Sequence, residues 1–297
     1  SMGEIRRIVA LISDSERSTV VLALAARLAR THGAGLHAVH AVEPIGSGAY
    51  MTPEAAGLAV QWAAEEEAKR RAAAAARVAE ASRQTGLPIT LVHTEHDPVG
   101  EALREACTSD LIVIAQRDPR HADGTAPALA ERVLVGSGCP LLFVPYVDTL
   151  PAQADGAPPV GGHVLVAWTP KRESTRALRD ALPLMRGSRQ VELMRFLRHD
   201  EADDGMTDAA VAWLGRHGIA ARTRVEHLAA PSFQERMLHS NAVDVPIAGA
   251  LLSYAADAGA DLIVMGGYGH PRAWELAMGG VTRTILHSMT VPVLMSH

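Results

Sequence analysis

Hydrophobic residues in this chain form short continuous runs, and between these runs they recur every three or four positions. The short runs, such as residues 5–12 and 261–265, have the length and β-branched content of buried strands. The longer stretches, such as residues 15–30 and 53–85, have the spacing of amphipathic helices. Alternating strands and helices predict an α/β fold with parallel strands, because each parallel connection needs a crossover of helix length.

The same pattern gives ten strands and eight helices in two similar halves. The predicted strands are residues 5–12, 36–42, 88–93, 110–115 and 140–144, then 163–168, 190–197, 219–227, 261–265 and 291–295. The predicted helices are residues 15–30, 53–85, 99–107 and 126–135, then 172–185, 203–217, 247–258 and 272–287. Five strands in each half fit a small doubly wound, Rossmann-like sheet with the strand order 3-2-1-4-5.

A repeated sequence supports an internal duplication. The tetrapeptide Asp-Leu-Ile-Val begins at Asp110 and again at Asp261. The segment 146–162 between the halves is rich in proline and glycine and has no apolar period, so it is predicted to be a linker. We therefore expect two tandem domains, at residues 3–146 and 163–297. The second half carries an extra polar stretch, residues 228–246, for which a functional loop and a disordered insertion both stay open.

Composition narrows the functional classes. A length of 297 residues suits two domains, and a net charge of −5 argues against non-specific nucleic-acid binding. No apolar run reaches the roughly 18 residues of a membrane span, and no export leader precedes the first strand. Cys107 and Cys139 lack metal-ligand spacing and are expected to be buried, reduced thiols. A cytoplasmic protein without a membrane partner is the expectation.

Glycines follow the predicted strand at residues 261–265. Gly266, Gly267 and Gly269 come directly after it, and Gly279 and Gly280 follow further on. Glycine lets the backbone turn through positive φ, so that amide groups can approach an anion. The carboxyl edge of a parallel sheet is also where ligands of α/β proteins bind. A phosphate-sized anion site is therefore expected there.

At these residues the chain resembles the universal stress protein (UspA-like) superfamily in its tandem form. The resemblance rests on the opening strand and helix, the Asp-Leu-Ile-Val-Met-Gly strand, the glycine loop and the closing Val-Pro-Val-Leu. ATP-binding members carry G-x2-G-x9-G-(S/T), and Gly266, Gly269 and Gly279 match its spacing. Gly280 stands where Ser or Thr is expected, and a hydroxyl follows at Thr282.

The resemblance implies an adenine nucleotide alpha hydrolase-like fold and ATP, with magnesium, as the ligand of the second half. The implied phosphate side is Gly266, Gly267, Gly269, His270, Gly279, Gly280, Val281 and Thr282. The implied base and ribose side is Val166, Ala167, Trp168 and Thr169. For Trp168 and Trp274, the alternative to lining a ligand is packing in the core or at the contact between the halves.

Both halves depart from the family pattern at the base. Thr169 and, in the first half, Ser13 stand where binding members have an aspartate. Asp14 comes one residue late and is expected to point elsewhere. No glycine follows the strand at residues 110–115 until Gly124, so the first half is predicted to have lost its site.

The resemblance implies a cytoplasmic stress-response binding protein whose halves pair as a pseudo-dimer, and it leaves a further homodimer open. The alternative is an adaptor that works by protein–protein contact or binds another small ligand. No catalytic residue is expected, because Ser137 lacks the spacing of a hydrolase nucleophile and no P-loop follows any strand, although slow ATP hydrolysis stays open. No metal site is expected, because the fourteen histidines show no ligand spacing.

Overall fold

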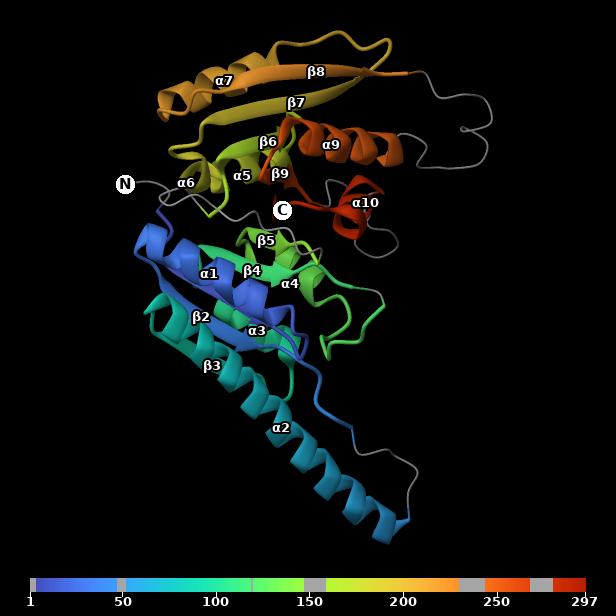
Figure 1. Cartoon of the computed structure of the whole chain (residues 1–297). Helices are drawn as coiled ribbons and strands as arrows, with labels where there is room; N and C mark the ends of the chain where they lie inside the picture. Colours follow the sequence, from blue (N-terminus) through green and yellow to red (C-terminus); the bar gives the residue numbers. More distant parts are fainter. Residues whose placement is uncertain (1–3, 47–51, 119, 147–158, 230–243, 268–279) are drawn as a thin grey trace. The chain divides into compact units, whose positions relative to one another are not determined.

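The protein is an α/β protein whose strands are mostly parallel (Figure 1). The computed structural model describes residues 4–46, 52–118, 120–146, 159–229, 244–267 and 280–297. By its contacts the chain divides into two compact units, Ile5–Cys139 and Pro140–His297. The predicted domain boundaries at residues 3–146 and 163–297 stay a prediction.

The first unit is a parallel sheet in the order β3-β2-β1-β4. Its strands are β1 (Arg7–Ile12), β2 (Gly35–His40), β3 (Ile89–His93) and β4 (Leu111–Ala115). Its helices are α1 (Ser18–His32), α2 (Pro53–Thr85), α3 (Pro98–Ala106) and α4 (Leu129–Ser137). Helix α2 begins where Thr52 accepts a hydrogen bond from the Ala55 amide, with Pro53 in its first turn.

The second unit has the strand order β5-β10-β9-β6-β7-β8. Its strands are β5 (Leu141–Val144), β6 (His163–Ala167), β7 (Gln190–Arg198), β8 (Arg222–Leu228), β9 (Leu262–Gly266) and β10 (Val293–Ser296). Its helices are α5 (Arg172–Asp180), α6 (Leu182–Met185), α7 (Met206–Arg216), α9 (Asp244–Ala258) and α10 (Gly280–Ser288). Strands β6 to β10 pair in parallel, in the predicted order 3-2-1-4-5, while β5 runs antiparallel to β10.

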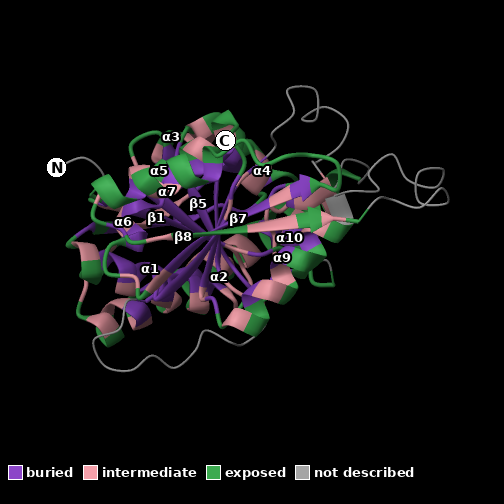
Figure 2. Ribbon diagram, turned by 90° about the horizontal axis from the view of Figure 1, so that it is seen from above, coloured by how far each residue is buried: buried purple, intermediate pink, exposed green. Residues whose placement is uncertain are grey.

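The central strands carry the core of each unit. Residues of β1, β4, β6 and β9 are almost entirely buried, as the purple strands of Figure 2 show. The edge strand β8 is largely half-buried or exposed. This pattern explains why the central strands read as continuous apolar runs.

The repeated aspartates have the same structural role in both units. The Asp110 carboxylate accepts hydrogen bonds from the amides of Arg6 and Arg7, at 2.8 and 2.9 Å. The Asp261 carboxylate accepts three, from the amides of Gly161, Gly162 and His163, at 2.9 to 3.1 Å. Each aspartate therefore ties the start of one central strand to the start of the next, at the edge opposite the expected ligand site.

The structure corrects three details of the sequence-based expectation. Residues 159–162, assigned to the linker, are buried. The helix expected at residues 172–185 is split into α5 and α6, because Pro183 has no amide hydrogen to continue the helical hydrogen bonds. Cys107 is exposed rather than buried, although both cysteines are free thiols as expected.

Candidate functional site

The carboxyl ends of β1 and β6 have the same turn. The Ser13 amide donates to Oγ of Ser18 at 3.0 Å, and the Thr169 amide donates to Oγ of Ser174 at 3.1 Å. In both turns the acceptor serine is buried and donates back to a carbonyl at the strand end. Ser13 and Thr169 therefore occupy equivalent positions, as the sequence comparison of the halves suggested.

The start of the glycine loop is tightly packed in the second unit. A Cβ on Gly266 would lie 2.7 Å from backbone atoms of Glu173 and Ser174, so only glycine fits where β9 meets α5. The Gly267 amide donates to the Ser296 carbonyl at 2.8 Å, and His297 Nδ1 lies 3.2 Å from the Gly267 carbonyl. The Gly267 amide is thus already used within the protein.

Of the other residues predicted to line the phosphate side, the structure describes Gly280, Val281 and Thr282. Gly280, Val281 and Thr282 form the beginning of α10 as the structure describes it. Gly280 and Val281 are half-buried, whereas Thr282 is buried and interacts with other protein groups. Gly269, His270 and Gly279, together with Trp274, lie outside the described residues.

The residues of the predicted base side, from the end of β6 into the following turn, differ in exposure. Val166 is completely buried within the sheet, Ala167 is half-buried, and Thr169 is exposed. Trp168 is 5% exposed, and its backbone amide donates to the Met194 carbonyl at 2.8 Å. Its indole N–H is buried and has no hydrogen-bond partner among the described residues. A buried donor left without a partner costs about 1–3 kcal/mol.

In the first unit the corresponding edge is filled by the protein's own groups. Asp14 accepts hydrogen bonds from Arg70 Nε at 2.6 Å and, through its other oxygen, from His40 Nε2 at 3.0 Å. Gly124 packs directly on this pair, and its carbonyl accepts a hydrogen bond from the Glu43 amide at 2.7 Å. As expected from the sequence, Asp14 is engaged elsewhere rather than facing a ligand.

Asp14 carries a negative charge at neutral pH. Burial works against this charge, but the hydrogen bonds from His40 and Arg70 outweigh it and hold the pKa of Asp14 below its usual value. A carboxylate at this position would repel a phosphate group. Asp14 and its partners His40 and Arg70 therefore occupy the space beside Ser13.

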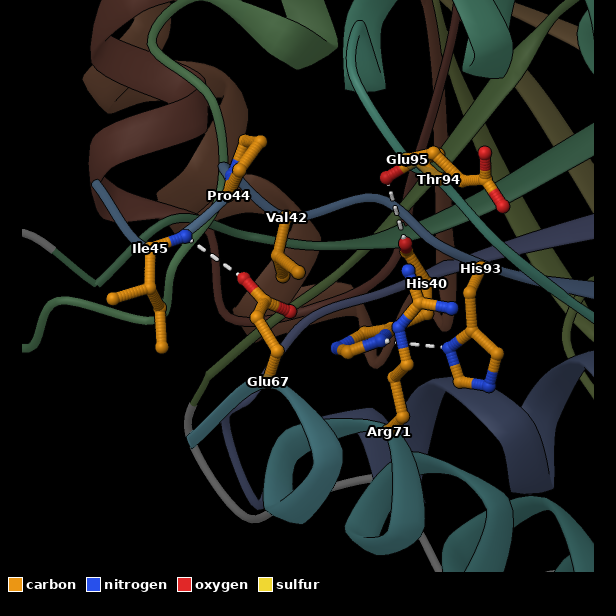
Figure 3. A pocket seen from close by; sticks show the side chains of 9 residues that line it. All are labelled: His40, Val42, Pro44, Ile45, Glu67, Arg71, His93, Thr94 and Glu95. Carbon is orange, nitrogen blue, oxygen red and sulfur yellow. Dashed lines mark hydrogen bonds between the residues drawn. The ribbon is translucent and has the colours of Figure 1, made fainter. Parts of the chain in front are cut away.

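Two histidines at this edge were not singled out from the sequence. His40 ends β2 and His93 ends β3, and their Nδ1 atoms lie 3.1 Å apart. Both line a pocket of about 150 Å³ together with Arg71 of α2 (Figure 3). The signal was available, since histidines that end neighbouring parallel strands must meet at one edge of the sheet.

Candidate catalytic and metal-binding residues give no site in the described part of the chain. Ser137 ends α4, and its hydroxyl accepts a hydrogen bond from the Cys139 amide at 3.1 Å. Gly138 follows in the left-handed conformation and ends the helix. Within the described ranges, no group of three His, Cys, Asp or Glu side chains could hold a metal ion.

Two tandem α/β units whose strands are mostly parallel define a class of duplicated Rossmann-like folds. The chain belongs to the universal stress protein family, whose profile matches residues 4–145 and 162–297. No curated protein matches the sequence. Across the described helices, none has both the length and the apolar character needed to span a membrane.

Two solved structures share the fold over nearly the whole chain. A universal stress protein from Archaeoglobus fulgidus DSM 4304 is 17% identical, with a TM-score of 0.67 over 98% of this chain and 97% of its own. A functionally unknown protein from Pseudomonas aeruginosa PAO1 is 14% identical, with a TM-score of 0.58 over 98% and 92%. An Archaeoglobus fulgidus universal stress protein solved in complex with dAMP is 20% identical over 48% of this chain and 98% of its own, with a TM-score of 0.27.

Proposed function

We propose that this tandem universal stress protein is a cytoplasmic, non-catalytic stress-response protein that binds an adenine nucleotide through its second domain. The proposed site is the edge where β6 and β9 end. The observation that carries the proposal is the buried indole N–H of Trp168, which has no partner among the described residues. The ring nitrogens of an adenine are acceptors that such a donor can satisfy.

The contrast between the two units supports this choice of domain. In the first unit, Asp14 and Arg70 fill the space beside Ser13. In the second unit, the equivalent Thr169 is exposed and offers its hydroxyl to a ribose or phosphate. Family members are also known to bind such ligands, as the dAMP complex of the Archaeoglobus protein illustrates.

The phosphates are proposed to lie near Gly280 and Val281, which are half-buried in the described part of α10. A glycine-rich backbone can bring amide groups close to a phosphate. Gly269 and Gly279 remain predicted members of this site. Gly267 contributes shape rather than a hydrogen bond, because its amide is held by Ser296.

The test measures ATP binding by calorimetry in the wild type and in Trp168→Phe. Phenylalanine keeps an aromatic ring but removes the donor, so the affinity should fall by about 0.5–1.5 kcal/mol, or roughly two- to tenfold. Trp213→Phe is the matched control, because Trp213 lies on α7 against Arg179 and His217. Its affinity should equal that of the wild type. Titrations with and without magnesium show whether the metal contributes.

The alternative, an adaptor that acts by protein contact, is favoured by one observation. Leu58, Val60 and Trp62 on α2 are each more than half exposed, at 71%, 57% and 56%. Leu58 and Trp62 are four residues apart and therefore lie on one face of α2, and exposed apolar side chains that share a face are typical of interaction surfaces. The adaptor function replaces the nucleotide function if saturating ATP gives neither heat nor a shift in melting temperature.

A further inference from the structure

A separate pocket lies in the first unit, at the carboxyl ends of β2 and β3. It has a volume of about 150 Å³ and is covered on one side by α2. A cavity that holds one water molecule needs a volume of only about 10–15 Å³, so this pocket has room for a small molecule. It is lined mainly by polar groups, which makes a charged or polar occupant the natural one.

Arg71 provides a positive charge that no described residue neutralises. Figure 3 shows its side chain reaching from α2 toward the two histidines. Among the described residues, the Arg71 guanidinium has neither a hydrogen bond nor an ion pair. The neighbouring Arg70, in contrast, is held by Asp14 and Glu67. A half-buried guanidinium without a partner is a strong donor for an oxyanion.

The acidic side chains around the pocket do not form an ion pair with Arg71. Glu67 uses its Oε1 atom to accept from the Ile45 amide at 2.8 Å and from Arg70 Nη1 at 3.1 Å. Glu95 is exposed, and in Figure 3 its carboxylate points away from Arg71. Asp14 is shielded behind His40 and Arg70. The positive charge of Arg71 therefore faces the pocket.

The two histidines form a hydrogen-bonded chain that ends on Asp14. A carboxylate can only accept, so Nε2 of His40 donates to Asp14. With one proton on each ring, Nδ1 of His40 then accepts from Nδ1 of His93. This leaves Nε2 of His93 as the atom that can take up a further proton, while Asp14 at the far end compensates the added charge.

We propose that this pocket binds a small oxyanion on Arg71, and that binding is coupled to proton uptake by His93. The ligand class is a molecule with a compact group of the sulfate, phosphate or carboxylate type. The planar guanidinium fits such a group with two parallel hydrogen bonds. The site is distinct from the proposed nucleotide site, because it lies in the other unit and uses none of its residues.

The charge balance at His93 supports the coupling. Burial lowers the pKa of His93, and the nearby His40 and Arg71 lower it further. These effects favour the neutral form of His93. An anion on Arg71 offsets the positive charge and so raises the pKa of His93. By linkage, the affinity for the anion must rise as the pH falls through this range.

The experiment measures the pKa of His93 by NMR of its ring protons, with and without sodium sulfate at constant ionic strength. Sulfate is the probe because its charge stays constant between about pH 5 and pH 8. We expect sulfate to raise the pKa of His93 by about one unit, the lower end of the effect of a nearby opposite charge. The sulfate affinity should then be about tenfold higher below this pKa than above it.

Variants separate this pocket from other anion sites. Arg71→Gln should weaken the proton-coupled sulfate binding about tenfold or more, and His93→Gln should abolish its pH dependence. Arg83→Gln is the matched control on α2, since Arg83 is exposed and pairs with Glu80. Trp168→Phe should bind sulfate like the wild type, so failure of the nucleotide site does not affect this test. Parallel titrations with phosphate and malonate identify the favoured oxyanion.

Two results would overturn the proposal. One is an unchanged pKa of His93 at saturating sulfate. The other is a sulfate response that is the same in Arg71→Gln as in the wild type. Thermal melting of each variant checks that it is folded. Arg71→Gln should melt like the wild type, because Arg71 has no partner among the described residues whose loss would destabilise the unit.

Discussion

Gly124 shows how strongly a single residue can determine what a site holds. It adopts φ +75°, and a Cβ there would lie 2.6 Å from both Asp14 Oδ2 and Arg70 Nη2. The absence of a side chain is therefore what allows the Asp14–Arg70 ion pair to fill the edge of the first unit. The filled site and the glycine depend on each other.

We predict that Gly124→Ala destabilises the protein more than Gly86→Ala does. Both glycines have positive φ, at +75° and +67°, but a Cβ on Gly86 would meet no atom within 4 Å. Gly86→Ala should thus cost only the backbone strain, about 1 kcal/mol. Gly124→Ala also disturbs a partly buried ion pair, which should add roughly 1–3 kcal/mol. Urea denaturation of the two variants measures the difference, and equal values would show that the ion pair is not under steric control.

Residue-level inference from the sequence succeeded where each half could be compared with the family pattern. The equivalence of Ser13 and Thr169 and the displacement of Asp14 followed from the position at which that pattern has an aspartate. The partner of Asp14 could not be found in this way, because Arg70 lies 56 residues further along the chain on a different element. The indole N–H of Trp168 shows the same limit, since a sequence cannot tell whether a buried donor has a partner.

Several elements of the second unit meet at the buried carboxylate of Glu192 on β7. It accepts hydrogen bonds from Tyr254 of α9 at 2.7 Å and Gln190 of β7 at 2.6 Å. His163 of β6 and Arg222 of β8 complete its partners, at 2.9 and 3.1 Å. Burial alone would raise the pKa of Glu192, but these hydrogen bonds outweigh burial and lower it to about 2.

We predict that Glu192 makes the second unit sensitive to acid. Its pKa is lower in the folded protein than the usual 4.5, so its contribution to stability is complete above pH 4.5 and is lost as the pH falls toward 2. The shift corresponds to roughly 3 kcal/mol. The free energy of unfolding of Glu192→Gln should therefore fall less steeply over this range than that of the wild type. Glu226→Gln is the control, because Glu226 on β8 is only half-buried and pairs only with Arg224 among the described residues. A slope shared by all three proteins would contradict the prediction.

The elements themselves were largely predictable, because hydrophobic periodicity reports burial directly. Helix α2 has the expected bounds, 53–85, since Pro53 and Gly86 mark its ends in the sequence. The break between α5 and α6 was missed, although Pro183 was visible, because the apolar spacing continues across it. Strand β8 was placed three residues early, since an exposed edge strand has a weak apolar pattern.

At the scale of the whole molecule, the sequence repeats and the compact units do not coincide. Strand β5 ends the first repeat, yet it pairs with β10 and belongs to the second unit. Duplication of a sequence predicts five strands per repeat, and this is correct. Which unit a terminal strand joins depends on a long-range pairing that no local pattern encodes.

We predict that a fragment of residues 140–297 is more stable than a fragment of residues 159–297. The longer fragment keeps β5, which satisfies the backbone groups of β10 and covers its apolar side chains. The midpoint of urea denaturation should therefore be higher for the longer fragment. Leu142→Pro in the longer fragment is the control, because proline opposite Leu294 removes a ladder hydrogen bond and should abolish the gain. Equal midpoints for the three fragments would show that β5 does not stabilise the second unit.

The pairing of β5 with β10 also sets the order of events on the ribosome. Phe143 pairs with Val293, so 150 residues must be synthesised after β5 before its partner exists. At roughly 5–20 residues per second, this takes about 10–30 seconds. For that time a nascent chain carries the apolar sequence Leu-Leu-Phe-Val without the strand that pairs with it in the second unit.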